Sequence, residues 1–177
     1  MNIIVFKRDG SWCHRPDSSL NHIYMDYYRP EFVQRSEVVP VVYTRIVKAG
    51  KCIPLRFAQR YFGEFALGCT INDTTPGVSE PMASSLDFTS VMGMDFFPAI
   101  GFNDNRLSLE INGSETCVIS TSSLADEFCK AISAISQRST IRLGDIVALE
   151  VGPAREIAPG DTVSLCRDGE RHTLKII

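Results

Sequence analysis

Short runs of β-branched and other apolar residues, each closed by a turn signal, recur along most of this chain. The densest run spans Val38 to Val47. Another run, Leu107 to Ile111, alternates apolar and polar residues and leads into Asn112-Gly113, the dipeptide typical of a two-residue hairpin turn. Runs of this length and composition predict strands. The chain is therefore expected to fold mainly as β structure.

Further strands are expected on the same grounds, over residues 2–7, 62–71, 115–119, 146–151, 162–165 and 172–177. The run from Val38 is expected to form a hairpin with Cys52-Ile53. Its Pro40 predicts an edge strand or a bulge, because proline cannot donate to a strand ladder. Residues 11–36, which prolines interrupt, and residues 73–90, which are rich in Thr, Ser, Pro and Gly, are expected to be loops.

One segment has helical spacing. Its apolar residues recur at intervals of three and four, at Leu124, Phe128, Ile132 and Ile135. Ser123 precedes them as the cap of a helix would, so a helix packed on the core is expected over 124–136. Pro54 to Arg60 predicts one short helix with proline at its first position. The expected fold class is mainly β with α (α+β), a curled mixed β-sheet or β-roll with one substantial helix.

The length and net charge of the chain exclude several classes of function. A chain of 177 residues is most simply one domain. The formal net charge is -3 and no Lys/Arg-rich block occurs, which argues against a nucleic-acid partner. No run approaches the roughly 18 apolar residues of a membrane span. The N-terminus lacks the order of charge and apolar residues that a signal peptide has, so a cytoplasmic protein is expected.

Six cysteines are spread along the chain without a CxxC pair or a Cys/His cluster. This spacing argues against a structural zinc site. Without a secretory context, the cysteines are expected to be reduced and mostly buried.

Five short segments stand in a fixed order: Arg15 to Leu20 (RPDSSL), Ser36 to Val38 (SEV), Gly68 to Asp73 (GCTIND), Asn112-Gly113, and Thr140 to Ile177 with its two Gly-Asp strand starts. This order resembles the fumarylacetoacetate hydrolase family and covers most of the chain. The resemblance implies one domain over 1–177, with an N-terminal strand and lid-like loop over 1–36 and a β-rich core over 37–177. It also implies a homodimer.

The resemblance further implies a divalent metal site. The family holds Mg²⁺ or Mn²⁺ with Glu-x-Glu on one strand and an Asp on the next, and hard ions of this kind need carboxylate oxygens. By position, Glu37 and Asp73 are the expected metal ligands, while Val39 stands where the second Glu belongs and cannot bind a metal. Without a metal, Glu37 would be an exposed charge at the start of a strand and Asp73 a turn residue.

Three positions correspond to the family's substrate-binding segments: Arg15, Met92 and Glu150. Met92, in the segment 91–95, stands where the family has a lysine and offers no hydrogen-bond donor. Glu150 lies in Leu149 to Gly152, where the family has its TGTP loop, and would repel a substrate carboxylate.

Two histidines, His14 and His22, lie in the lid-like loop and are the candidates for general acid–base catalysis, because the pKa of histidine is near neutrality. The simpler alternative for both is a surface histidine.

Three functions remain open. The first is a divergent, divalent-metal-dependent hydrolase or lyase acting on small 2-oxo acids or acylpyruvates, with an impaired site. The second is a non-catalytic homodimeric binding or structural protein that retains the fold. The third is a β-barrel binding module unrelated to the family.

Overall fold

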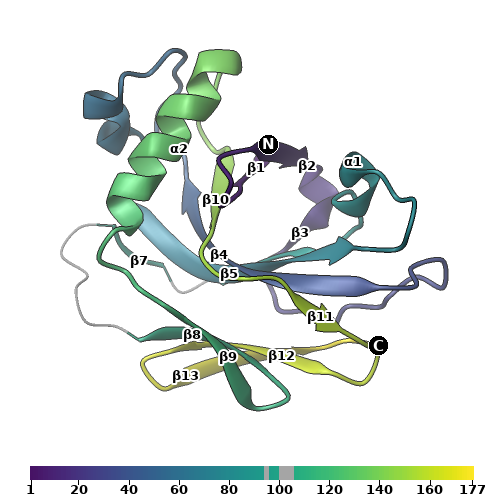
Figure 1. The fold of residues 1–177 in the computed structure, drawn as a ribbon. Helices are drawn as coiled ribbons and strands as arrows, with labels where there is room; N and C mark the ends of the chain where they lie inside the picture. Colours follow the sequence, from purple (N-terminus) through teal and green to yellow (C-terminus); the bar gives the residue numbers. More distant parts are fainter. Residues whose placement is uncertain (94–95, 100–105) are drawn as a thin grey trace.

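Strands are the main regular structure of the molecule and form two sheets (Figure 1). The structure is a computed structural model and describes residues 1–93, 96–99 and 106–177. Its strands are β1 (Ile3–Phe6), β2 (Trp12–Arg15), β3 (Leu20–Asn21), β4 (Ser36–Arg45), β5 (Glu64–Asp73), β6 (Ser90–Met92), β7 (Phe97–Pro98), β8 (Leu107–Ile111), β9 (Ser114–Ile119), β10 (Ile146–Glu150), β11 (Arg155–Ile157), β12 (Thr162–Arg167) and β13 (Glu170–Lys175). Its helices are the 3₁₀ helices η1 (Asp17–Ser19) and η2 (Leu55–Tyr61) and the α-helices α1 (Glu80–Ala83) and α2 (Leu124–Arg138).

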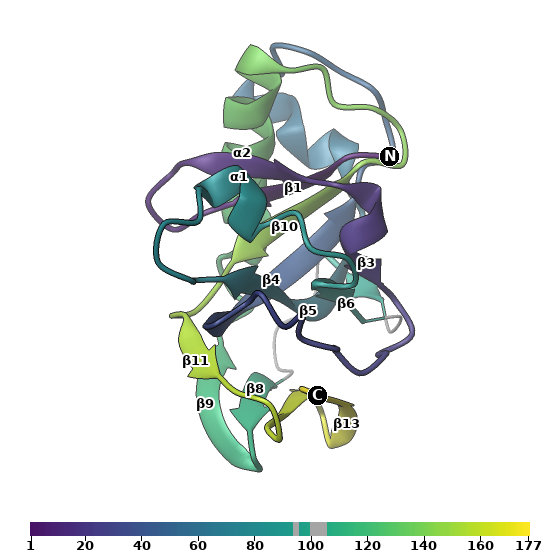
Figure 2. The ribbon, with the colours of Figure 1, turned by 90° about the vertical axis from the view of Figure 1, so that its right-hand side faces the viewer.

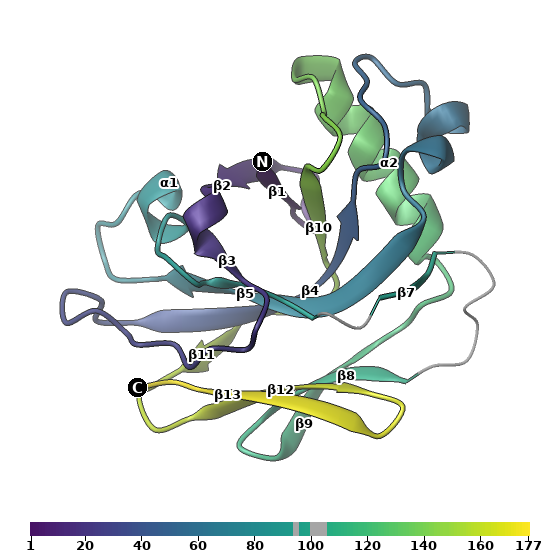
Figure 3. The same ribbon diagram turned by 180° about the vertical axis from the view of Figure 1, so that it is seen from behind.

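The larger sheet has the strand order β2-β1-β10-β4-β5-β6-β3, with β11 paired to β4 and β7 paired to β5. Its long strands β4 and β5 are antiparallel, whereas β1 and β10 run parallel. The sheet curls into an open half-barrel, which Figure 3 shows from behind and Figure 2 from the side. The expected curled mixed sheet is confirmed.

The smaller sheet, β13-β12-β8-β9, packs below the larger one (Figure 1). The main core lies on the outer side of the half-barrel, against this sheet and α2. There the Phe128 ring of α2 is 4.7 Å from Phe65 and 5.8 Å from Phe62, measured between ring centroids. A smaller apolar cluster, which includes Val41, Tyr43 and Met92, fills the inner side.

Strand β4 lies inside the sheet, not at its edge. Its partners are β5 on one side and β10 and β11 on the other, so the hairpin expected between Val38 to Val47 and Cys52-Ile53 is wrong. Pro40 is tolerated because it lies between the part of β4 that pairs with β10 and the part that pairs with β11. At that junction its carbonyl accepts the Val151 N–H at 3.0 Å, and no donor is needed.

The segment 11–36 is more ordered than expected. It contains β2, which pairs with β1, and the short elements η1 and β3. Further along, Tyr27 joins the chain's last residues: its N–H donates to the Lys175 carbonyl and its carbonyl accepts the Ile177 N–H, at 2.8 and 2.9 Å. The loop is thus fixed to the C-terminal strand.

The other local expectations are close to the structure. Helix α2 covers the expected helix, although the Ser123 hydroxyl donates to the Glu127 side chain and caps no backbone group. Asn112 and Gly113 both have positive φ, as a primed hairpin turn requires. The loop 73–90 contains only α1.

Within the described residues, no helix combines the length and the apolar character needed to cross a membrane.

All six cysteines are free. Cys69 is buried, Cys52 is exposed and the other four are half-buried, so the expectation that most are buried is correct only for Cys69.

Candidate functional site

A pocket of about 400 Å³ opens on the inner side of the half-barrel. Strands β1 and β2 form one wall, β4 and β5 the opposite wall, and α1 and the end of β10 the rim. Its charged side chains are Lys7, Arg15, Glu37, Asp73, Glu80 and Glu150. We call this the Arg15 pocket.

Arg15 ends β2 and is only 3% exposed. Its guanidinium crosses the interior to β5, where Nη1 donates to Asn72 Oδ1 at 2.8 Å and Nη2 donates to the Ile71 carbonyl at 2.8 Å. Nη2 also donates to Thr89 Oγ1 at 2.7 Å, while Nε has no partner in the part of the chain that the structure describes. All its acceptors are neutral, and burial lowers the pKa of the guanidinium. A guanidinium remains charged in proteins, so the pocket contains a buried cation without a carboxylate partner within the described residues.

Glu37 is linked to the Arg15 guanidinium by hydrogen bonds through Asn72. The two residues are opposite each other in the β4–β5 ladder, and Asn72 Nδ2 donates to Glu37 Oε1 at 3.4 Å. Asn72 therefore links the Arg15 guanidinium on one side to the Glu37 carboxylate on the other.

Asp73 lines the same pocket but belongs to the next ladder position, opposite Ser36. Glu37 and Asp73 are therefore not paired in the ladder, although both line the pocket at the end of β5. Asp73 is 6% exposed and its Oδ1 accepts the Thr75 N–H at 2.8 Å, as in an Asx turn. Its charge acts on Tyr27 of the outer core: burial and Asp73 together raise the pKa of Tyr27 to about 12.

These positions do not fit the metal site that the resemblance implies. Val39, where the second Glu is expected, is a buried apolar residue opposite Thr70, and Asp73 Oδ1 already accepts the Thr75 N–H. No group of three His, Cys, Asp or Glu side chains in the described ranges is arranged to hold a metal ion. A hard divalent ion needs several converging oxygens, which this donor set does not provide.

Glu150 stands at the rim, where β10 ends. One of its carboxylate oxygens accepts the Arg8 N–H at 3.3 Å. Burial raises the pKa of Glu150, and the negative charge of Glu37 acts in the same direction, while the Arg8 hydrogen bond and Lys7 oppose the shift. Lys7 itself forms an ion pair with Glu80 of α1. Glu150 is thus a half-buried carboxyl group that holds its proton more tightly than an exposed one.

The other predicted site residues lie apart from this group. His14 is exposed on the face of β2 opposite Cys13 and Arg15, with its ring edge against Trp12 at 5.3 Å. His22 is exposed on the loop after β3 and lines no pocket described here. Met92 is buried in the inner cluster. Residues 94–95 of its segment lie outside the described residues.

Sequence reasoning missed Lys7 and Asn72. Asn72 was visible as the neighbour of Asp73, and the alternation of side chains would have placed it beside Glu37 once the strand register was known. Lys7 had no local signal, because its role depends on β1 pairing with a strand from the far end of the sequence.

No family model matches this chain, and no curated protein sequence matches it. Several solved structures do. A Yersinia pestis protein assigned to the fumarylacetoacetate hydrolase family aligns with a TM-score of 0.83 and 18% identity, covering 99% of this chain and 92% of that one. A fumarylpyruvate hydrolase from Pseudomonas aeruginosa, solved with Mn²⁺ and pyruvate, aligns with a TM-score of 0.84 and 14% identity, covering 100% and 89%.

A 2-hydroxyhepta-2,4-diene-1,7-dioate isomerase from Mycobacterium marinum aligns with a TM-score of 0.86 and 16% identity, covering 99% of this chain and 74% of that one. The chain therefore has the fold of fumarylacetoacetate hydrolase family proteins. At these identities the similarity concerns the fold.

Proposed function

We propose that this chain, with its fumarylacetoacetate hydrolase-type fold, is a divergent hydrolase or lyase that binds a small 2-oxo acid or acylpyruvate in the Arg15 pocket. The observation that carries the proposal is the buried Arg15 guanidinium, whose acceptors are all neutral. A buried cation without a counter-ion favours an anionic ligand, and guanidinium groups match the geometry of carboxylates. The P. aeruginosa fumarylpyruvate hydrolase of similar fold, solved with pyruvate, supports the same ligand class.

Each nearby residue has a role in this proposal. Arg15 attracts the ligand's carboxylate, and Asn72 fixes the orientation of the guanidinium. Glu150 exchanges a proton with the carbon next to the keto group, because its raised pKa suits a group that must both accept and donate a proton near neutral pH. Proton transfer from this carbon to the Glu150 carboxylate gives the enolate of the 2-oxo acid, and return of the same proton to the keto oxygen gives the enol or to the carbon gives back the keto form, so this proton-transfer step is balanced without another reactant.

The proposal includes no step through a metal ion. Two of the similar structures contain Mn²⁺, and the resemblance implies Mg²⁺ or Mn²⁺ held by Glu37 and Asp73. In this chain Val39 stands where the third carboxylate is expected, and no group of three potential metal ligands is found in the described residues. Ligand binding is therefore expected to be independent of added divalent ions.

The alternative is a non-catalytic homodimeric binding protein with the same fold. Two buried apolar residues favour it: Met92 and Val39 occupy the positions where the resemblance expects a lysine and a metal-binding glutamate. A ligand that binds without being converted would support this alternative.

Calorimetric titration with pyruvate and acetylpyruvate, with and without Mn²⁺, tests the proposal. Millimolar or tighter binding that Mn²⁺ does not change is expected. Arg15→Gln should weaken it about tenfold or more, since charge-assisted hydrogen bonds contribute about 1.5–3 kcal/mol. Arg15→Lys keeps the positive charge at this position. Arg138→Gln, at an exposed position, is the matched control. Thermal melting verifies that each variant is folded. No binding to the wild-type protein would overturn the proposal. Loss of acetylpyruvate absorbance on incubation distinguishes the enzyme from the binding protein.

A further inference from the structure

Two segments that are distant in the sequence, residues 46–63 and 134–144, form one end of the molecule. The Gly50 and Ile141 backbones exchange two hydrogen bonds, each of 3.0 Å. The first segment contains η2 and the second contains the last turn of α2, and both lie at the end remote from the smaller sheet (Figures 1 and 3). Side chains from the two segments therefore share one surface.

This surface is strongly basic. Six exposed cations gather on it, out of the 18 Lys and Arg residues of a chain whose net charge is -3. None of the six belongs to an ion pair found in the described residues, and neither segment contains an acidic residue. We call this surface the basic end, and its cations are Lys48, Lys51, Arg56, Arg60, Arg138 and Arg142.

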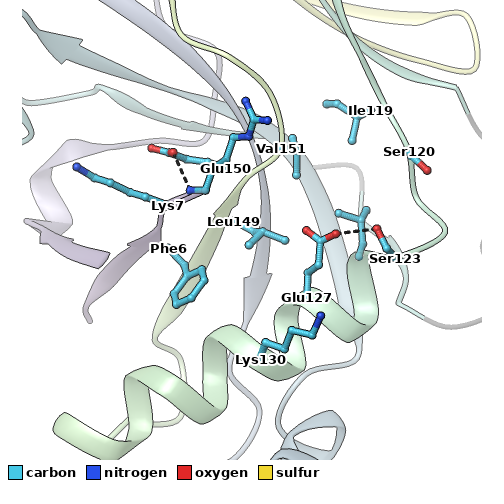
Figure 4. Close-up of a pocket in the computed structure, with 12 residues that line it drawn as sticks. Phe6, Lys7, Ile119, Ser120, Ser123, Glu127, Lys130, Leu149, Glu150 and Val151 are labelled. Carbon is cyan, nitrogen blue, oxygen red and sulfur yellow. Dashed lines mark hydrogen bonds between the residues drawn. The ribbon is translucent and has the colours of Figure 1, made fainter. Parts of the chain in front are cut away.

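The neighbouring acidic residues do not neutralise the basic end. Asp145 follows the second segment, but it is buried and its carboxylate accepts the Arg142 N–H at 2.8 Å. Glu64 follows the first segment, is exposed and offsets one of the six charges. Towards the start of α2 the charges are mixed, because Glu127 and Lys130 lie on successive turns (Figure 4). A local excess of positive charge therefore remains at this end.

The aromatic rings of the basic end lie beneath its cations. The guanidinium carbons of Arg56 and Arg60 lie 4.7 and 4.9 Å from the centroid of the Phe57 ring. Lys48 Nζ lies 5.6 Å from the centroid of the Tyr61 ring. Contacts of this kind hold the charged groups over the rings. Single-stranded nucleic acid needs exposed rings for base stacking, and both of these rings are half-buried, so this ligand fits the surface poorly.

Apolar side chains project among the cations. Val47, Leu55 and Leu143 are 53%, 53% and 72% exposed, and each is the sequence neighbour of a basic residue. None of the main cavities in the described residues is lined by these three side chains, so they do not form the wall of a groove for a peptide. Apolar side chains beside lysine and arginine are typical of surfaces that enter the headgroup boundary of a bilayer.

We propose that the basic end binds the surface of an anionic phospholipid membrane. Its six cations attract the lipid headgroups, and Val47, Leu55 and Leu143 enter the boundary between headgroups and acyl chains. The Arg15 pocket is lined by none of these residues. The inference therefore goes beyond the proposed function and does not depend on it.

Sedimentation of the whole chain with lipid vesicles tests this inference. The protein should bind vesicles of mixed phosphatidylcholine and phosphatidylserine far more than vesicles of phosphatidylcholine alone, because only the mixed vesicles are anionic. High salt should release it, because salt screens the attraction between exposed charges.

Two charge variants locate the contact. The double variant Arg56→Gln/Arg60→Gln should lower the partition coefficient about 25-fold, because each cation near an anionic surface contributes about fivefold. Arg35→Gln/Lys175→Gln removes the same charge from exposed positions outside the basic end and is the matched control. Thermal melting verifies that both variants are folded. Equal effects of the two double variants would overturn the proposal.

An apolar variant separates a bilayer from a soluble polyanion. Leu143→Ser should weaken binding about threefold to tenfold, because part of the leucine side chain leaves water when the protein binds. Ile23→Ser, at an exposed position outside the basic end, is the control. An unchanged affinity of Leu143→Ser would overturn the membrane assignment, because charge alone does not distinguish a bilayer from a polyanion.

The remaining outcomes also decide the matter. Equal binding to the two kinds of vesicle, or binding to neither, would overturn the proposal. Binding to polyuridylic acid without binding to phosphatidylserine vesicles would assign the basic end to nucleic acid and overturn it as well. None of these results concerns pyruvate, so the membrane contact and the proposed function fail separately.

Discussion

Glu37 stands opposite Asn72, and not opposite Asp73, in the ladder between β4 and β5. One ladder position separates the two acidic side chains of the expected metal site, and Asp73 Oδ1 accepts the Thr75 N–H of the turn that follows β5. The face that Glu37 shares with Asn72 also receives the Arg15 guanidinium. The inner side of the half-barrel thus has a fixed organic cation close to Glu37.

Replacing Glu37 or Asp73 by its amide, in two separate variants, should have different effects on ligand binding. Glu37→Gln removes a negative charge near the Arg15 pocket and should strengthen pyruvate binding about twofold to fivefold, corresponding to a partly screened charge interaction of about 1 kcal/mol or less. Asp73→Asn keeps the acceptor for Thr75 and should leave the affinity unchanged. Calorimetry measures both. Equal effects of the two substitutions would contradict the specific link from Glu37 through Asn72 to Arg15.

Glu150→Gln should change stability in a pH-dependent way. The folded-state pKa of Glu150 is raised above the ordinary 4.5, so the folded protein binds this proton more tightly than the unfolded chain does. The charged carboxylate therefore lowers stability as pH rises through the raised value. Glu150→Gln should be more stable than the wild type at neutral pH, by only a few tenths of a kcal/mol because Glu150 is partly solvated. Urea unfolding should show the difference vanish below pH 4.5. A difference that grows on acidification would have the wrong sign.

Gly68→Ala should be strongly destabilising. A Cβ at Gly68 would lie 2.2 Å from the Val91 carbonyl oxygen and 2.4 Å from the Tyr43 ring. Neither neighbour is a flexible chain end, so the strands must separate, at a cost of about 2–3 kcal/mol. Gly63→Ala is the control, because nothing lies within 4 Å of the added carbon. Equal urea midpoints for the two variants would show that β5 and β6 are less closely packed than described.

Tyr27→Phe should cost little or no stability. The Tyr27 hydroxyl is buried and has no hydrogen-bond partner among the described residues, and an unsatisfied buried hydroxyl gives no stability. The expected change in unfolding free energy lies between zero and a gain of about 1 kcal/mol. A loss of more than about 1 kcal/mol in urea unfolding would instead indicate a partner for this hydroxyl, such as an internal water.

Local patterns predicted those elements that depend on near neighbours. The apolar stripe from Leu124 to Ile135 predicted α2, and Asn112-Gly113 predicted the turn between β8 and β9. The same patterns failed where pairing is long-range. Residues 12–15 have no strand-like alternation, and they form β2 because β1 offers a partner edge. Pro40 suggested an edge strand or a bulge, and the edge strand is wrong, because the gap between β10 and β11 that accommodates the proline is not visible in the sequence.

The candidate site was predictable as a set of positions and not as a geometry. Arg15, Glu37, Asp73 and Glu150 were all selected from the sequence, and all four line one pocket. The register of β4 and β5 decides which of these side chains lie on the same face of the sheet. A shift of one residue in that register would move a side chain to the other face. The buried state of Arg15 depends on Asn72 and Thr89, which are distant from it in sequence.

The pairing of β1 with β10 has a consequence for how the molecule folds. The Asn2 N–H donates to Asp145 Oδ1 across a sequence separation of 143 residues, and the loop around Tyr27 joins Lys175 and Ile177. Contacts of such long range slow folding, because a long loop must close before they contribute any stability. During synthesis, β1 and β2 are made before β10. Until β10 is made, the apolar edge of β1 that pairs with it is exposed to other chains. The wall that holds Arg15 is therefore completed late, and this waiting period is when the protein is most prone to aggregate.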